Sequence, residues 1–261
     1  MNKIVVAICL IGFAAIPVLA AEVVVAAASD LGFAVKEIIT DFEKQTGNKV
    51  RLSLGSSGTF AAQISNGAPF DVFLSADVAY PQDLDKKGFT EPNSIFVYAV
   101  GRIALWVPKS STVDIQKLGM QSLLDPSIGK IAIANPEHAP YGRAAVSAMQ
   151  HFGLYEKVKA KLVFGENISQ AAQFVQSGSA QIGIIALSIA LSDSMRASGT
   201  YWQIPVEAYP RMDQAGVILK QAKKADHLDA SRAFVDMFRS SRGRAILERY
   251  GFSLPKDSSA R

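Results

Sequence analysis

The 261-residue sequence contains a single cysteine, Cys9. Cys9 lies inside an apolar run, residues 4–18, that follows Lys3 and ends in small residues. A basic start, an apolar stretch and a small-residue end are typical of a secretory signal peptide, so we expect residues 1–21 to be removed on export. The mature chain would then have neither disulfides nor a thiolate metal site, which suits the bacterial periplasm.

A second long apolar run is also missing. A transmembrane helix needs about 20 consecutive apolar residues, and nothing after residue 21 has this character. Charge of one sign is lacking too, because 27 Lys and Arg face 23 Asp and Glu, a formal net charge of +4. This excess is too diffuse for nucleic-acid binding but is compatible with an anionic ligand. We therefore expect a soluble exported protein with no nucleic-acid partner.

Apolar runs of strand length alternate with apolar residues at helical spacing. Strands are expected at residues 22–28, 49–54, 71–74, 96–107, 130–134, 182–185 and 215–219. Helices are expected at residues 33–46, 59–66, 78–87, 140–152, 169–176, 187–196, 226–238 and 242–250. Alternation of this kind predicts an α/β protein with mostly parallel sheets flanked by helices.

The order of these elements predicts two lobes. The strands at residues 96–107 and 215–219 are candidate crossovers, with a second set of strands and helices inserted between them. We expect residues 22–101 plus 214–261 to form the first lobe and residues 102–213 the second. Ligands of open α/β sheets bind beyond the carboxyl ends of strands, so a binding cleft is expected between the lobes.

Four expected strand-to-helix junctions carry small polar residues. They are Ala28-Ser29-Asp30-Leu31, Gly55-Ser56-Ser57-Gly58-Thr59, Pro140-Tyr141-Gly142 and Glu166-Asn167-Ile168-Ser169. Helix starts expose unpaired N–H groups and a partial positive charge, and several of them in one cleft can bind a desolvated anion without a cationic side chain. The same residue types are equally typical of ordinary helix caps, so the pattern alone leaves both interpretations open.

Five segments, in the same order, resemble the periplasmic molybdate-binding proteins of ABC importers. They are AAASDLGFAVKEI, GSSGTFAAQISNGAPFDVFLSAD, NPEHAPYG, ENISQAAQFVQSGSAQIGII and RYGFSLP. They span nearly the whole mature chain, and residues 55–77 are the most specific. The resemblance implies a type II periplasmic-binding fold, a monomer whose lobes close around molybdate or tungstate and deliver it to the membrane permease of the importer. It implies no cofactor.

The resemblance also implies the ligand-binding residues. Carried over, they are Ser29 and Asp30 at the first junction, Ser57 at the second, Tyr141 at the third, and the backbone amide of Ile168. In this family hydroxyl and backbone N–H groups hold the oxygen atoms of the anion, without direct coordination of the metal.

The chain departs from the family branch best known in enteric bacteria. That branch has a second serine in place of Asp30, a tyrosine in place of Ala186, and a small residue in place of Tyr141. A second branch has the GSSG loop and a tyrosine at position 141, and this chain is more similar to it. Asp30 is then expected to contribute its amide, while Tyr141 could contribute its hydroxyl or its amide.

Asp30 also keeps a second ligand class open. Its carboxylate would repel a fully ionised oxyanion but could accept the proton of HPO₄²⁻, which favours phosphate over sulfate or molybdate. Another tetrahedral oxyanion, phosphate or sulfate, is therefore kept as the alternative ligand. If the carboxylate instead caps the helix amides, the conflict disappears. We expect this capping role for Asp30, with the carboxylate turned onto the helix amides and away from the anion.

A secreted hydrolase that uses the cleft between the lobes is the alternative from another class. The sequence has three histidines, His138, His151 and His227, but no pair at metal-ligand spacing and no Gly-x-Ser-x-Gly elbow. His138 is expected to stabilise its loop. We therefore expect no catalytic residues and no enzymatic activity.

Overall fold

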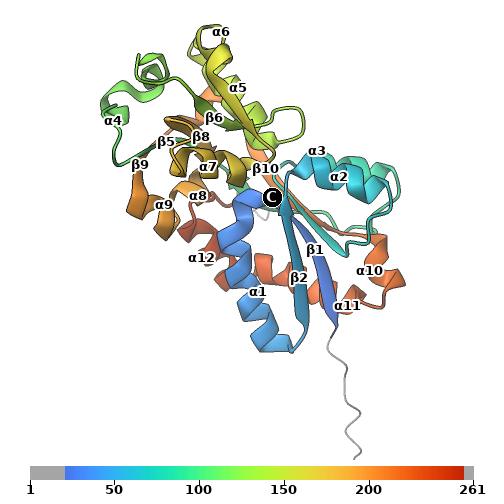
Figure 1. The fold of residues 1–261 in the computed structure, drawn as a ribbon. Helices are drawn as coiled ribbons and strands as arrows, with labels where there is room; N and C mark the ends of the chain where they lie inside the picture. The colour runs from blue at the N-terminus through green and yellow to red at the C-terminus, as the bar shows by residue number, and fades with distance from the viewer. Residues whose placement is uncertain (1–20, 256–261) are drawn as a thin grey trace, which may run out of the picture.

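The first of two sheets is built mainly from the N-terminal part of the chain (Figure 1). The computed structural model describes residues 21–255. The strand order is β2-β1-β3-β10-β4, with β1 parallel to β2 and β3 and β10 antiparallel to β3 and β4. The strands are β1 (Glu22–Ala28), β2 (Lys49–Gly55), β3 (Val72–Ser75), β4 (Phe96–Gly101) and β10 (Met212–Ile218). We call the part of the chain built on this sheet the first lobe.

The second sheet has the order β7-β6-β8-β5-β9. Here β6 is parallel to β7 and β8, while β5 is antiparallel to β8 and β9. Its strands are β5 (Ile103–Pro108), β6 (Ile131–Ala134), β7 (Leu162–Gly165), β8 (Ile182–Ala186) and β9 (Gly199–Gln203). We call the part built on this sheet the second lobe. Both sheets are mixed, because the strands that connect the lobes run against their neighbours.

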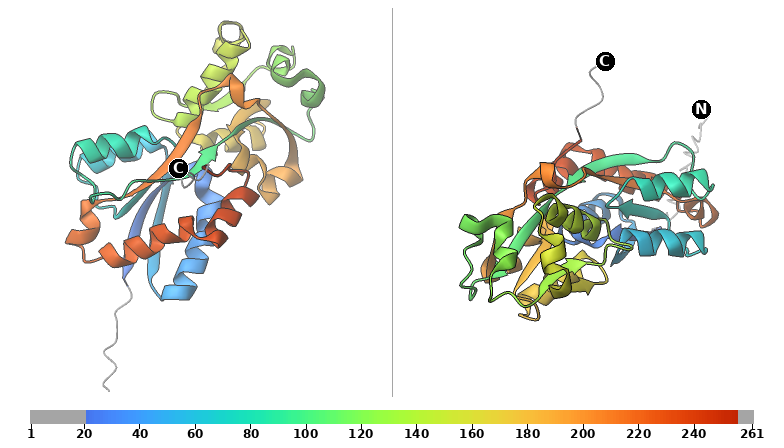
Figure 2. Two further views of the ribbon diagram at one scale, coloured as in Figure 1. Left: turned by 180° about the vertical axis from the view of Figure 1, so that it is seen from behind. Right: turned by 90° about the horizontal axis from the view of Figure 1, so that it is seen from above.

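The chain crosses between the lobes twice. Figure 2 shows the green segment of β4 and β5 and the orange strand β10 passing between the two bodies. The single strand expected at residues 96–107 is wrong, because β4 and β5 belong to different sheets and meet at Arg102. Strands β7 and β9 are not among the expected strands. The apolar run of β7 is only three residues long, and β9 combines polar and aromatic residues that are half-buried or exposed.

Helices cover the faces of both sheets, as the periodicity predicts. The longer ones are α1 (Gly32–Thr46), α2 (Ser57–Ser65), α3 (Ala79–Lys86), α5 (Pro140–His151), α7 (Ile168–Gln176), α11 (Leu228–Arg239) and α12 (Ser241–Arg249). The helix expected at residues 187–196 is instead two helices, α8 (Leu187–Ala190) and α9 (Asp193–Ser198). The break arises at Ser192, whose hydroxyl accepts a hydrogen bond from the Met195 amide and so starts a new helix.

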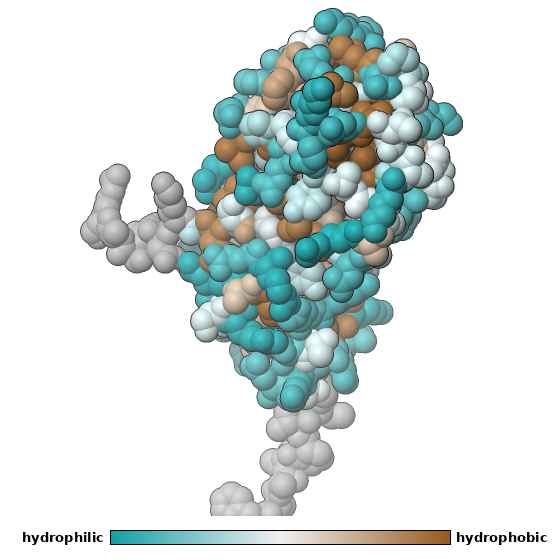
Figure 3. Space-filling view, turned by 90° about the vertical axis from the view of Figure 1, so that its left-hand side faces the viewer, coloured by the Kyte–Doolittle hydropathy of each residue, from teal (hydrophilic) through white to brown (hydrophobic). Residues whose placement is uncertain are grey.

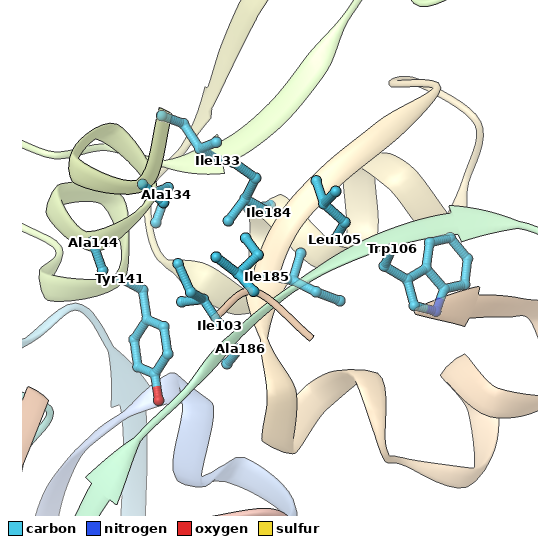
Figure 4. Packing of buried hydrophobic residues seen from close by; sticks show 14 of the residues in the cluster. Ile103, Leu105, Trp106, Ile133, Ala134, Tyr141, Ala144, Ile184, Ile185 and Ala186 are labelled. Atoms are coloured by element: carbon cyan, nitrogen blue, oxygen red, sulfur yellow. The ribbon is translucent and has the colours of Figure 1, made fainter. Parts of the chain in front are cut away.

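Each lobe has its own apolar core. In the first lobe Phe42 of α1 meets Phe234 of α11 edge-on, with ring centroids 5.3 Å apart. In the second lobe Trp106, Ile184 and neighbouring side chains are fully buried (Figure 4). Burial of one such side chain contributes roughly 1.5–3 kcal/mol. These cores hold the strand ends, and thus the junctions between strands and helices, in fixed positions.

The surface differs between the lobes. On the face shown in Figure 3, apolar residues gather mostly in the upper half and polar residues cover most of the lower half. Phe164 and Val206 of the second lobe are among the large apolar side chains that are exposed. Within residues 21–255, no helix combines the length and apolar character needed to cross a membrane. The predicted signal peptide, apart from Ala21, lies outside the described residues.

Candidate oxyanion-binding site

A small cavity lies where the two lobes meet. The space within it, counting the part that is open to solvent, is about 190 Å³. It is lined by Ala28, Ser29, Asp30, Gly55, Ser56, Ser57, Ala76, Ala139, Pro140, Tyr141 and Ile168. All five residues implied by the family resemblance are thus brought to one place, from both lobes. None of the lining residues is a lysine, an arginine or a histidine.

Three helices begin at this cavity. Helix α2 starts at Ser57, α5 at Pro140 and α7 at Ile168. The first amides of a helix have no intrahelical partner and lie at the positive end of its dipole. Each of the three helix starts contributes one such amide at the cavity, because the cavity is lined by Ser57, Tyr141 and Ile168. Such an arrangement can bind an anion.

The caps of these helices explain which amides stay available. The Ser56 hydroxyl accepts a hydrogen bond from the Thr59 amide at the start of α2. At the start of α7, the Asn167 side chain accepts from the amides of Ser169 and Gln170, at 3.0 and 3.1 Å. The capping interpretation is therefore correct for Ser56 and Asn167. Both caps use amides later in the first turn and leave those of Ser57 and Ile168 free of a cap.

Glycine is required where the second junction approaches the other lobe. The Gly58 amide donates to the carbonyl oxygen of His138 at 3.0 Å. A Cβ atom on Gly58 would lie 2.6 Å from the same oxygen, closer than real Cβ contacts. This backbone contact brings the start of α2 close to the loop that precedes α5.

Hydrogen bonds join the lobes on the side of the cavity formed by the first junction. The Ser29 hydroxyl donates to Asn167 Oδ1 at 3.2 Å, and the Ser169 hydroxyl donates to the Ser29 carbonyl oxygen at 3.1 Å. The Ser188 hydroxyl donates to the carbonyl oxygen of Asp30 at 2.8 Å. These contacts hold the first turn after β1 against α7 and α8.

Further contacts join the lobes near the second and third junctions. The Ser56 hydroxyl lies 2.8 Å from His138 Nδ1. The Arg143 guanidinium donates to Asp77 Oδ2 at 2.7 Å and to the Tyr80 hydroxyl at 3.1 Å. His138 thus does more than stabilise its own loop, because it contacts the first lobe. The lobes are closed in this structure.

The Asp30 carboxyl has partners other than the helix amides. The Tyr141 hydroxyl donates to Asp30 Oδ2 at 2.8 Å, and Gln214 Nε2 donates to the same oxygen at 2.7 Å. Gln214 Nε2 also lies 3.0 Å from the Tyr141 hydroxyl oxygen and donates to it. The expected capping role of Asp30 is wrong, because Asp30 lies inside the short 3₁₀ turn η1 (Ser29–Leu31) and its carboxyl reaches across to the second lobe and to β10.

Burial perturbs the acidity of this group of side chains. Burial raises the pKa of Asp30 from 3.8 to about 6, although hydrogen bonds from Gln214 and Tyr141 and the nearby backbone amides of Asp30 and Leu31 partly offset the effect. Burial, together with the charge of Asp30, raises the pKa of Tyr98 and of Tyr141 well above the ordinary value of a tyrosine. Both phenols therefore keep their protons, and the Tyr141 proton is already engaged by Asp30.

Gln214 is a site residue that the sequence did not predict. In the sequence it marks only the boundary between the lobes, but in the structure its side chain is fully buried and donates to both Asp30 and Tyr141. The available signal was a glutamine at the edge of an expected apolar strand. Ala186 is buried at the end of β8 and is not a lining residue of the cavity.

Comparison with known proteins identifies the family. Residues 23–253 match the family model of the bacterial extracellular solute-binding proteins. The molybdate-binding protein ModA of Azotobacter vinelandii is 41% identical over 235 residues, which cover 90% of this chain and 91% of that protein. ModA of Rhodobacter capsulatus is 37% identical, with 91% and 90% covered.

A solved structure supports the same assignment. The periplasmic molybdate-binding protein of Azotobacter vinelandii superposes with a TM-score of 0.82 at 35% identity, covering 90% of this chain and all of that chain. The two-lobed periplasmic-binding fold and the resemblance stated from the sequence are thereby confirmed. The chain belongs to the bacterial extracellular solute-binding protein family.

Proposed function

We propose that this chain is the periplasmic binding protein of an ABC importer and that it binds molybdate or tungstate in the cavity between the lobes. One observation carries the proposal: residues of both lobes bring three helix starts to a cavity without a cationic side chain. The names of relatives at 41% and 37% identity support molybdate as the ligand. They do not favour the hydrolase alternative, nor phosphate or sulfate as the main ligand.

The lobe boundaries and the oligomeric state are part of this proposal. Residues 22–101 plus 214–261 would move as the first lobe and residues 102–213 as the second, with the protein acting as a monomer. Strand β10 begins at Met212, so the second crossover spans the proposed boundary. Residues 1–21 would be removed on export to the periplasm.

In the proposed complex, the oxyanion oxygens accept hydrogen bonds from both lobes. Ser57 is well prepared, because its hydroxyl oxygen accepts from the Ala76 amide at 2.9 Å and keeps its own proton for the ligand. Ser29 would exchange its hydrogen bond to Asn167 for one to the anion. The amides of Asp30 and Ile168 would add further donors.

Tyr141 contributes its amide in this proposal. Its hydroxyl has one proton, which it donates to Asp30, and the oxygen accepts from Gln214. Its amide is the first available one of α5, because Pro140 before it has no N–H. The aromatic ring packs in the second-lobe core, and Figure 4 shows the hydroxyl directed away from that core toward the blue N-terminal segment.

Closure of the lobes would accompany binding. The hinge would lie where the chain crosses between the lobes, near Gly101 and Gln214. A ligand favours the closed state when some of its contacts exist only there. We expect small-angle scattering of the mature protein to give a smaller radius of gyration with molybdate than without it, and equal radii would contradict the proposed closure.

Calorimetric titration of the mature protein with molybdate, tungstate, sulfate and phosphate tests the ligand. Tight binding of the first two alone is expected, because Mo–O and W–O bonds are longer than S–O bonds and the cavity selects by size. Ser57→Ala should weaken molybdate binding by roughly 10- to 150-fold, the equivalent of a hydrogen bond to a charged group. The exposed Ser110→Ala is the matched control and should bind normally. Binding of phosphate or sulfate instead would overturn the ligand assignment.

A further inference from the structure

Asp30 is the only acidic residue that lines the cavity, and no cationic residue balances it. The titratable groups that act on its carboxyl are two neutral phenols, Tyr98 of β4 and Tyr141 of α5. The Gln214 amide of β10 donates to the carboxyl, and the Ser188 hydroxyl of α8 donates to the Asp30 carbonyl oxygen. The start of α7 presents the Asn167 side-chain amide and the Ser169 hydroxyl, which are neutral too, to the adjacent Ser29. A doubly charged oxyanion in this cavity would therefore face a carboxyl group with no cationic side chain beside it.

The two carboxyl oxygens of Asp30 are not equivalent. Oδ2 accepts hydrogen bonds from both Tyr141 and Gln214. Oδ1 is buried and has no hydrogen-bond partner among the described residues. Asp30 lines the cavity and its Oδ2 already has two donors, so Oδ1 is the carboxyl oxygen left for a further partner.

We propose that Asp30 binds the oxyanion as a neutral carboxylic acid, donating a proton from Oδ1 to an oxyanion oxygen, so that each dianion binds together with one proton. This inference rests on the proposed function and adds to it a residue that carries a proton into the complex. The proton comes from the solvent and stays on the carboxyl group. The step converts an unpaired acceptor into a donor.

The energetics favour this protonation state. A carboxylate and a dianion repel each other strongly when water is excluded, so their proximity favours proton uptake. Burial already brings the pKa of Asp30 to about 6 before any ligand charge is added. For the carboxyl to stay protonated in the complex at pH 8, a bound dianion must raise this pKa well above the neutral range.

Titration calorimetry of the mature protein with molybdate, in buffers of different ionisation enthalpy, measures the proton count directly. At pH 8 we expect uptake of close to one proton per molybdate, and a dissociation constant that rises about tenfold from pH 7 to pH 8. Molybdate binding without proton uptake would overturn the inference.

Asp30→Asn is the decisive variant, because an amide can donate to the anion without carrying a titrating proton. It should bind molybdate with no proton uptake and no change of affinity between pH 7 and pH 8. Asp213→Asn changes a carboxyl of β10 that pairs with Arg211, and it should keep the wild-type proton count. If Asp30→Asn took up as many protons per molybdate as the wild-type protein, the inference would also be overturned. If the wild-type protein bound no molybdate at either pH, the proposed function itself would fail.

Discussion

The Tyr141 hydroxyl donates a 2.8 Å hydrogen bond to the Asp30 carboxyl and so connects residues of different lobes across the wall of the cavity. Gln214 of the crossover strand β10 donates to both. This group of three side chains therefore links the ligand cavity to a segment that joins the lobes. A substitution at the crossover that displaces Gln214 should therefore also displace Asp30 and Tyr141 and weaken ligand binding.

Tyr141→Phe tests whether the hydroxyl or the amide of this residue serves the ligand. The variant keeps the amide and the ring but loses the hydrogen bond to Asp30. We expect molybdate affinity to fall only by about 1 kcal/mol, the net value of one hydrogen bond, and hence less than in Ser57→Ala. Calorimetric titration of both variants makes the comparison. A loss in Tyr141→Phe as large as that in Ser57→Ala would show that the hydroxyl contacts the anion.

Gly101→Ala tests the link between the crossover and the cavity. A Cβ atom there would lie 2.7 Å from the Tyr141 hydroxyl and 2.8 Å from Gln214 Nε2, so the group of three must shift. We expect weaker molybdate binding and a larger radius of gyration in the presence of ligand. Gly129→Ala is the control, because its nearest contact would be an ordinary 3.6 Å. Wild-type affinity in Gly101→Ala would refute the link.

Arg143→Ala tests the ion pair at the edge of the cleft. Arg143 and Asp77 join the lobes at 2.7 Å, with side chains 41% and 31% exposed. Partly exposed pairs contribute roughly 0.2–1 kcal/mol. We expect molybdate to dissociate up to a few times faster, measured by stopped flow. Arg211→Ala, which breaks a pair of similar exposure within one segment, should leave dissociation unchanged.

Asp30→Asn should also change the pH dependence of stability without ligand. Because burial raises the folded-state pKa of Asp30 from 3.8 to about 6, the ionised carboxyl destabilises the folded protein above pH 6, and this cost disappears as the pH falls below 4. A shift of this size corresponds to about 2–3 kcal/mol. Thermal unfolding at pH 7.5 should show a variant several degrees more stable than wild type, with little difference near pH 4. A less stable variant at pH 7.5 would contradict this.

The sequence predicts the parts of the fold that depend on local patterns. Apolar periodicity located most helices and the buried strands such as β1 and β8. Serines and glycines at the junctions indicated where helix starts would meet a ligand. The resemblance then assigned Ser29, Ser57, Tyr141 and Ile168 to one site, and the structure brings them to one cavity.

Features that depend on tertiary contacts could not be predicted. The apolar run at residues 96–107 predicts a crossover between the lobes, but not the residue at which it divides into β4 and β5. The partners of the Asp30 carboxyl lie 111 and 184 positions away, so a local rule assigned it to a helix cap instead. Gln214 could not be assigned to the site from the sequence, because its position depends on the antiparallel pairing of β10 with β4.

A crystal structure of the mature protein grown with tungstate tests the central claim most directly, because the anomalous signal of tungsten locates the anion. The account predicts one strong peak in the cavity, with oxyanion oxygens within hydrogen-bond distance of the Ser57 hydroxyl and of the Tyr141 and Ile168 amides. A peak outside this cavity, for example against Arg143 and Arg211 in the neighbouring pocket, would contradict it.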